Sequence, residues 1–285
     1  MTDKQNDASN LLDIAAYVVP GLTADIRQVK IGETLRAGRF VPPVGHIVDF
    51  ERAHVVGVDF SGGTFYAMRA VGSLFEDCDF SRCKFETGHF YGRQTVFRRC
   101  DFGRADLRRL RPGTARFEEC TFDHAKLDGW IARDSEFVEC RFAGRIRGVN
   151  FSASLDKDDL RDLDPPRTAN EFRGNDFRQA QLMGVDFKRG IDLDQQCLPG
   201  GPDQVRLDRI QERVARALAL VSMWPQSRER DELRRGLEVQ AMVYADSDEA
   251  FVHRADFKGK VGKRLLEVLI EALPSDEQQE GRSPS

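Results

Sequence analysis

The sequence of 285 residues predicts a mainly β fold, a four-sided coil of short extended segments followed by an α-helical C-terminal region. Three observations predict the coil. A large apolar residue, Phe or Leu, returns every five residues; the residue two places before it is small; and similar segments recur about 20 residues apart. The segments "FRRCDFGRADLRRL" (97–110), "FEECTFDHAKLDGW" (117–130) and "FVECRFAGR" (137–145) combine the three features.

The five-residue beat uses most of the 20 Phe residues of the chain. It runs through Phe60, Phe65, Phe75, Phe80, Phe85, Phe90, Phe97, Phe102, Leu107, Phe117, Phe122, Leu127, Phe137, Phe142, Phe151, Phe172, Phe177, Leu182 and Phe187. A period of five fits neither a helix nor a plain strand. A short extended piece and a turn bury one large side chain and rotate the chain by a quarter. Four such pieces close a coil, and successive coils then stack about 4.8 Å apart.

The small position before each large residue is often Cys, which raises the question of a disulfide or metal site. Cys78, Cys83, Cys100, Cys120 and Cys140 occupy this inward position. Free Cys behaves as a small buried hydrophobe, so we expect these side chains to fill the core. Their Cβ atoms would stay about 4.8 Å apart, beyond the range that favours a disulfide.

A metal ion would need His or acid beside the thiolates. His89 and His124 fall at outward or corner positions, so no metal site is expected. The sixth cysteine, Cys197, lies beyond the repeats. We therefore name no metal, cofactor-binding or catalytic residues. The predicted structural core comprises Phe97, Phe102, Leu107, Phe117, Phe122, Leu127, Phe137, Phe142, Cys100, Cys120 and Cys140.

The motif small–polar–Phe/Leu–any–any resembles that of the pentapeptide-repeat proteins, and "RADLRR" (104–109) and "GVDFKR" (184–189) match it closely. The resemblance covers residues 46–193, about half of the chain. It implies a right-handed quadrilateral β-helix. One branch of the family protects type II topoisomerases such as DNA gyrase by presenting an acidic rod that imitates DNA. The resemblance thus implies a protein partner, with DNA gyrase as the specific candidate.

Charge supports DNA mimicry only in part, because residues 46–195 hold 26 acids against 24 bases. No basic stripe emerges from the sequence, so direct nucleic-acid binding is not expected. The stacking predicts that Arg98 lies over Glu118 and that Arg99 lies over Glu119, as opposite charges on neighbouring coils. We interpret these pairs first as structural compensation.

The beat is interrupted between Phe151 and Phe172, where "SASLDKDDLRDLDPPRTAN" (152–170) is inserted. Stacking resumes with Phe172 over Phe137 and Asn175 over Cys140, so the insertion is expected to be a loop leaving one corner. Its acids, the candidate partner-binding residues, are Asp156, Asp158, Asp159, Asp162 and Asp164. Long loops on rigid scaffolds often carry function. A merely tolerated insertion is the alternative.

The remaining segments flank the coil. Residues 1–45 are expected to form an N-terminal cap or arm, and residues 274–285 a disordered tail. Residues 194–273 predict three helices: one after a cap near Asp203, one over 228–244 with Leu233, Leu237 and Met242 inward, and one over 260–273. We expect this region to cover the open edge of the coil. The alternatives are a homodimer, which some relatives form through C-terminal elements, and a small independent helical domain.

Enzyme motifs are absent from the sequence, and no apolar run is long enough to span a bilayer. The N-terminus has no basic segment typical of a signal peptide, so a cytoplasmic location is expected. The sequence therefore predicts a non-enzymatic interaction module without cofactors, membrane contact or direct nucleic-acid contact. One predicted function is modulation of a type II topoisomerase. The other is a structural scaffold that binds an unknown protein through the acidic loop and the C-terminal helices.

Overall fold

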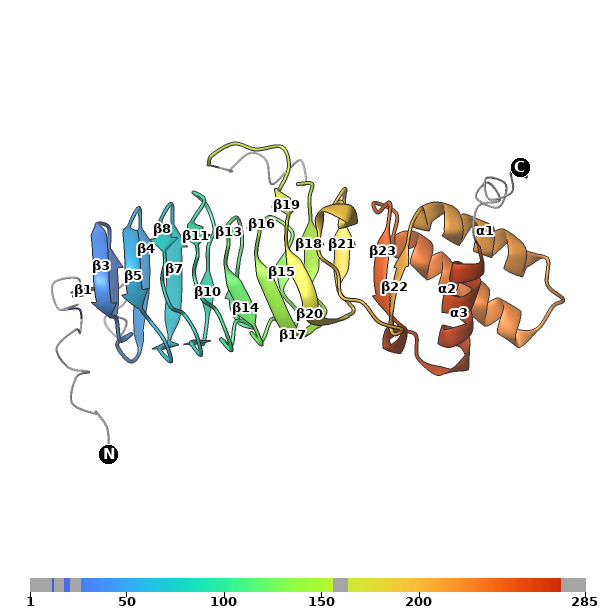
Figure 1. The fold of residues 1–285 in the computed structure, drawn as a ribbon, viewed down its shortest axis with the longest axis horizontal. Helices are drawn as coiled ribbons and strands as arrows, with labels where there is room; N and C mark the ends of the chain where they lie inside the picture. The colour runs from blue at the N-terminus through green and yellow to red at the C-terminus, as the bar shows by residue number, and fades with distance from the viewer. Residues whose placement is uncertain (1–11, 13–17, 21–26, 156–163, 273–285) are drawn as a thin grey trace, which may run out of the picture.

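A computed structural model describes residues 12, 18–20, 27–155 and 164–272 of the chain. The chain forms a rod of stacked coils, and the C-terminal helices lie at one end of it (Figure 1). Each coil contributes one short strand to each of several parallel sheets that run along the rod. This is the quadrilateral β-helix that the resemblance to pentapeptide-repeat proteins implies, and the predicted fold class is confirmed.

One side of the rod is a seven-stranded parallel sheet, which we call the ladder side. Its strands, in spatial order, are β3 (Thr34–Arg39), β5 (His54–Asp59), β8 (Leu74–Glu76), β11 (Val96–Arg98), β13 (Arg116–Glu118), β16 (Glu136–Val138) and β19 (Phe172–Arg173). The register pairs Phe97 with Phe117, Phe117 with Phe137, and Phe137 with Phe172. The predicted stacking is therefore confirmed, including its resumption after the insertion.

A second side, which we call the tyrosine side, continues the same coils. It contains β1 (Val18–Pro20), β2 (Arg27–Ile31), β4 (His46–Glu51), β7 (Ala67–Val71), β10 (Gly88–His89) and β12 (Leu110–Arg111). Later coils contribute β15 (Ile131–Ala132), β18 (Asn150–Ser152) and β21 (Asp186–Lys188). The remaining strands of the coil are β6 (Thr64–Phe65), β9 (Lys84–Phe85), β14 (Thr121–Asp123), β17 (Arg141–Arg147) and β20 (Asp176–Met183).

The core of the rod is a set of aromatic columns. Phe117 is fully buried, and its ring is stacked between Phe97 at 5.2 Å and Phe137 at 5.1 Å. Phe122 is stacked in the same way between Phe102 at 5.2 Å and Phe142 at 4.9 Å. All eleven predicted core residues are buried. Because the shaft is filled by rings at van der Waals spacing, the position beside each ring accepts only a small side chain.

The N-terminal boundary of the coil differs from the expected one at residue 46. Strand β2 pairs in parallel with β4, and β3 pairs in parallel with β5. Phe40 is buried and packs on Phe60, with ring centroids 5.3 Å apart. The coil thus includes residues from 27 onward, because Ile31, Leu35 and Phe40 fill inward positions without the full motif. Of residues 1–26, the structure describes only residue 12 and residues 18–20. The expected tail 274–285 lies outside the described residues.

The C-terminal region contains three α-helices and a two-stranded antiparallel sheet. Its elements are η3 (Leu193–Gln195), β22 (Gln204–Leu207), α1 (Ile210–Ser222), α2 (Arg228–Val243), β23 (Ala250–His253), η4 (Arg254–Asp256) and α3 (Gly259–Glu271). Strands β22 and β23 pair antiparallel. The helix expected to begin near Asp203 instead begins at Ile210, because Gln204–Leu207 is held as a strand. The expected inward position of Met242 is wrong, since its side chain is 71% exposed.

The two-stranded sheet and the turn η4 that follows it cover the last coil. Phe251 of β23 joins the same apolar cluster as the rings of the shaft. The Asp256 carboxylate accepts a hydrogen bond from Gly184 N at 2.9 Å, and Arg189 N donates to Asp246 O at 2.9 Å. Backbone groups at the edge of the final coil are thereby given partners, as an open sheet edge requires.

Candidate interaction surfaces of the coil

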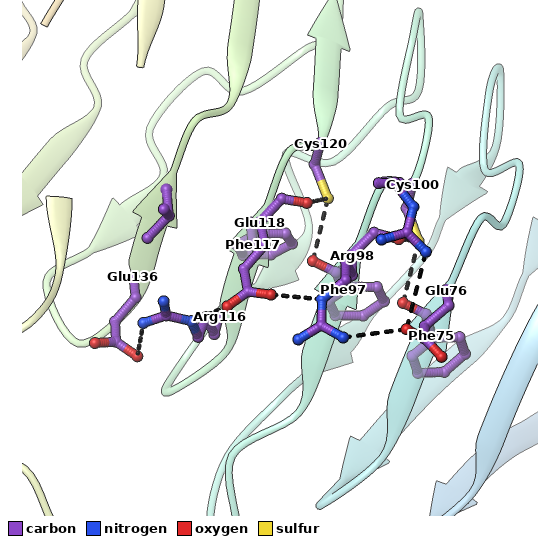
Figure 2. Close-up of polar contacts among 12 residues, drawn as sticks. Phe75, Glu76, Phe97, Arg98, Cys100, Arg116, Phe117, Glu118, Cys120 and Glu136 are labelled. Atoms are coloured by element: carbon purple, nitrogen blue, oxygen red, sulfur yellow. Dashed lines mark hydrogen bonds and ion pairs between the residues drawn. The ribbon is translucent and has the colours of Figure 1, made fainter. Parts of the chain in front are cut away.

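The ladder side carries a continuous network of ion pairs on its outer surface, which we call the charge ladder (Figure 2). Arg98 lies between two acids, with Glu118 at 2.7 Å and Glu76 at 3.1 Å. Arg116 lies 2.5 Å from Glu118 and 3.3 Å from Glu136. Because neighbouring coils present opposite charges, each acid of the ladder is neutralised within the surface.

The charge ladder continues past the insertion. Glu171 accepts from Arg116 at 2.7 Å and from Arg173 at 2.5 Å. The hydrogen bond from Arg116 is the main reason that the pKa of Glu171 is lowered. His54, at the other end, contacts Glu76 at 2.7 Å and lowers the pKa of that carboxyl. These acids are held ionised and paired, which is the opposite of a free row of phosphate-like charges.

The two predicted charge pairs have different outcomes. The contact between Arg98 and Glu118 is confirmed. The register places Arg99 over Glu119, as predicted, but Arg99 donates its hydrogen bonds to both oxygens of Asp77 on the preceding coil, at 2.7 and 3.0 Å. Stacking places Arg99 between Asp77 and Glu119, so sequence alone offered two equivalent partners.

The cysteines of the repeats lie inside the rod as free thiols. Cys120 Sγ donates to Phe97 O and Glu118 O, each at 3.3 Å, and Cys100 and Cys140 make equivalent contacts. Burial raises the pKa of Cys83 to about 12 and holds the pKa of Cys120 well above its usual range. Cys197, outside the repeats, is exposed. Among the described residues, no group of three or more His, Cys, Asp or Glu side chains could hold a metal ion.

The insertion after β18 is fixed to the rod at both described ends. Ser154 and Ala169 form an antiparallel bridge. Asn170, which is buried, donates to Ser152 O at 2.9 Å and also to Arg133 O. The neck of the loop is thus closed by backbone and side-chain hydrogen bonds.

The returning segment of the loop lies back along the rod toward earlier coils. Gln94 N donates to Asp164 O at 2.6 Å, and Arg93 lies 3.2 Å from the Asp164 carboxylate. Arg167 has little exposure and contacts Asn170, Asp134 and Glu136. Figure 1 shows the described return segment, which ends at β19, reaching back along the rod toward earlier coils, in agreement with the bridge between Arg93 and Asp164.

The structure places one of the five predicted loop acids. Asp164 lies on the rod beside Arg93, so it is an anchor. The other four, Asp156, Asp158, Asp159 and Asp162, lie outside the described residues. Sequence reasoning missed the anchoring roles of Arg167 and Asn170. The only available signal was that both follow Pro165–Pro166, where the chain must return to the coil.

Comparisons with known proteins give limited matches. No family model matches the chain, and no curated protein matches it. Among solved structures, full-length QnrB1, a plasmid-mediated fluoroquinolone resistance protein, is similar with 15% identity and a TM-score of 0.39, covering 61% of this chain and 92% of that chain. A trypsin-treated form of QnrB1 is similar with 16% identity and a TM-score of 0.34, covering 57% and 90%.

None of the helices within the described ranges has both the length and the apolar character needed to cross a membrane.

Proposed function

We propose that the protein is a non-enzymatic interaction module that uses its rigid coil to present the 152–170 loop to a protein partner. The observation that carries this proposal is the double anchoring of the loop, through Asn170 at its neck and Asp164 along the rod. A loop held in place loses less conformational entropy on binding than a free one. Loops mounted on rigid scaffolds are common recognition elements.

The proposed partner is a type II topoisomerase, with DNA gyrase as the specific candidate. The support is the resemblance of the repeats to the pentapeptide-repeat family, one branch of which protects type II topoisomerases. DNA mimicry is a weaker form of the proposal here, because Glu76, Glu118, Glu136 and Glu171 are all paired with Arg side chains or His54. We therefore assign the contact to the loop and not to the charge ladder.

A supercoiling assay with DNA gyrase tests the partner. The full chain is expected to change the supercoiling rate or to protect the enzyme from a quinolone at micromolar protein. Absence of any effect across that range would exclude gyrase as the partner.

Two loop variants then test the site. In the first, residues 155–168 are replaced by Asn-Gly, because Ser154 and Ala169 already pair as in a hairpin. In the second, Asp156, Asp158, Asp159 and Asp162 become Asn while Asp164 keeps its anchoring contact. If both variants lose the effect on gyrase, the charge of the loop is responsible. If only the Asn-Gly replacement loses it, the shape of the loop is responsible. Full activity of both variants would refute the loop as the contact.

A second candidate function, a scaffold that acts through its C-terminal helices, is favoured by one observation. Five large apolar side chains are exposed there. Met223 after α1 is 74% exposed, and Met242 of α2 is 71% exposed. The other three are Leu220 of α1 and Val239 and Val243 of α2. Such exposure is typical of a contact surface. The same surface is the one we propose for a homodimer. Sedimentation equilibrium of the full chain and of Met242→Glu distinguishes a dimer, which the variant would dissociate, from a monomer.

A further inference from the structure

We propose that the tyrosine side of the rod is a second docking surface, which binds an acidic segment of a partner protein. The surface is a column of outward side chains on successive coils, Arg69, His89 and Arg111, bordered by Tyr91 and Ile131. We call it the basic column. The basic column shares no residue with the described loop anchors or with the charge ladder, so this inference does not depend on the function proposed above.

The register of the parallel sheet stacks the basic column directly. Arg69 pairs with His89, and His89 pairs with Arg111, on adjacent strands β7, β10 and β12. The acid nearest in the column is Asp49, on the coil before Arg69. Its carboxylate is largely buried and already accepts from Arg69 and Gln28, each at 2.6 Å. No acid of the described chain forms an ion pair with Arg111, which is exposed.

The local potential of the column is positive. The pKa of His89 is lowered, first by partial burial and then by the charges of Arg69 and Arg111, with Asp49 acting against the shift. The same rod compensates its charges on the charge ladder, where Arg98 lies between Glu76 and Glu118. Within the column, Arg69 is paired with Asp49 and only Arg111 has no acid partner among the described residues. Arg111 is thus a local exception within one regular scaffold, and such exceptions concentrate at functional sites.

The side chains around the column match a protein interface. Tyr91 is 44% exposed, Tyr66 is 43% exposed and Ile131 is 64% exposed, which are unusual values in a coil whose other rings fill the core. The Tyr91 ring lies close above Gly113 of the next coil and 5.9 Å from the His89 ring, so it is held in place. Interfaces are enriched in Tyr and Arg, and their centres hold apolar groups.

These features define the chemistry of the occupant. Carboxylates would pair with Arg111 and the exposed part of Arg69, and an apolar side chain would cover Ile131 and Tyr91. A phosphate backbone could use the charges but would gain nothing from Ile131. We therefore commit to an acidic peptide that also carries apolar residues.

Fluorescence anisotropy with the full chain tests the proposal. The probe is a short labelled peptide of alternating Glu and Leu. The comparison probes are a Lys-Leu peptide and an oligothymidylate of equal length. The Glu-Leu peptide is expected to bind, more weakly as salt increases, while the Lys-Leu peptide does not. Tighter binding of the oligothymidylate would overturn the proposal in favour of single-stranded nucleic acid, and no binding of either anionic probe would overturn it outright.

Charge-reversal variants locate the site. Arg111→Glu is expected to lower the affinity for the Glu-Leu peptide by at least about tenfold. It is also expected to leave the melting temperature nearly unchanged, because Arg111 is exposed and forms no ion pair with a described residue. Arg145→Glu is the matched control: it changes the charge equally at an exposed position of β17, on another side of the rod. Equal weakening by both variants would show that only net charge matters and would refute the surface.

A third variant tests the apolar part of the surface. Tyr91→Ala is expected to lower the affinity for the Glu-Leu peptide but not the affinity for a peptide of alternating Glu and Ser. An unchanged affinity for the Glu-Leu peptide would remove Tyr91 from the contact and contradict the proposed chemistry.

Discussion

Arg99 binds Asp77 of the preceding coil through two hydrogen bonds, of 2.7 and 3.0 Å, and joins one corner of the rod to the next. Both residues have positive φ angles, 51° for Arg99 and 53° for Asp77, because the chain turns sharply at each corner. Exposed pairs of this kind contribute at most about 1 kcal/mol each. Most of the stability of the rod must therefore come from the buried aromatic columns.

Truncation of a stacked ring is expected to be costly. Phe117→Ala removes a ring held between Phe97 and Phe137. The expected loss is about 3–5 kcal/mol in the free energy of unfolding, with a smaller loss for Phe117→Leu, which leaves less empty volume. Urea unfolding followed by circular dichroism measures both variants. A loss from Phe117→Ala that does not exceed that from Phe117→Leu would contradict the packing described here.

The thiols are expected to differ sharply in reactivity. Five of the six Cys residues are buried and Cys197 is exposed, so a thiol reagent should modify one group in the native protein and all six in denaturant. Burial disfavours the reactive thiolate of Cys100 and Cys120, whose pKa values lie well above the usual range. The Cys197→Ser variant serves as the control and should show no rapid reaction. Fast reaction of that variant would mean that the coil opens readily.

The charge ladder is expected to make stability depend on pH. The pKa of Glu171 is lowered by the hydrogen bond from Arg116, against an unperturbed value of 4.5. Burial raises the pKa of Glu118, but hydrogen bonds from Arg116 and Arg98 outweigh it, so the net shift is downward. Carboxyls with a lowered folded-state pKa contribute their stability above the unfolded value and lose it as pH falls through the folded value. The urea midpoint should therefore fall below about pH 4.5.

Two substitutions distinguish the contribution of the charge ladder to the pH dependence of stability from that of other carboxyl groups. Glu118→Gln is expected to cost about 0.5–1 kcal/mol at neutral pH and to reduce the acid-dependent loss. Its neighbour Glu119 is exposed and forms no ion pair with any described residue, so Glu119→Gln should change stability by less than about 0.5 kcal/mol. Equal effects of the two substitutions would show that the ladder contributes nothing specific.

The C-terminal cover is expected to depend on one carboxylate. Asp256 accepts from Gly184 N at the edge of the final coil, so Asp256→Ala should increase hydrogen exchange of the Gly184 amide and of the adjacent β21 amides. Asp256→Asn retains an acceptor and should have a smaller effect. Unchanged exchange in Asp256→Ala would mean that the backbone of the last coil is protected in another way.

The coil could be predicted from the sequence because its determinants are local and repeated. Phe97, Phe117 and Phe137 identify the period by themselves, and one period determines the whole stack. The coil before residue 46 was missed because Ile31 and Leu35 are four residues apart and carry no preceding small–Asp pair. Strand β22 was missed for a different reason: its partner β23 lies more than 40 residues later, and such pairing leaves no periodic trace.

The surfaces were harder to predict because they depend on which coils meet. The sequence alternates acids and bases, and its balance of 26 to 24 in residues 46–195 suggested no sorting of charge. Folding nevertheless stacks Arg69, His89 and Arg111 in one column and alternates signs in another. Net charge says nothing about such columns, since register decides them. Arg167 and Asn170, which anchor the loop, gave no pattern either, because each makes its contacts only once.

The aromatic column continues across the insertion: Phe142 stacks on Phe177 at 4.6 Å, although 35 residues instead of about 20 separate them. A corner of this architecture therefore tolerates a long insertion. Foreign peptides could be grafted at the Ser154–Ala169 neck and displayed at a fixed height, while rod length is altered separately by adding or deleting whole coils. Evolution has the same freedom, since reach and recognition can be varied independently of each other.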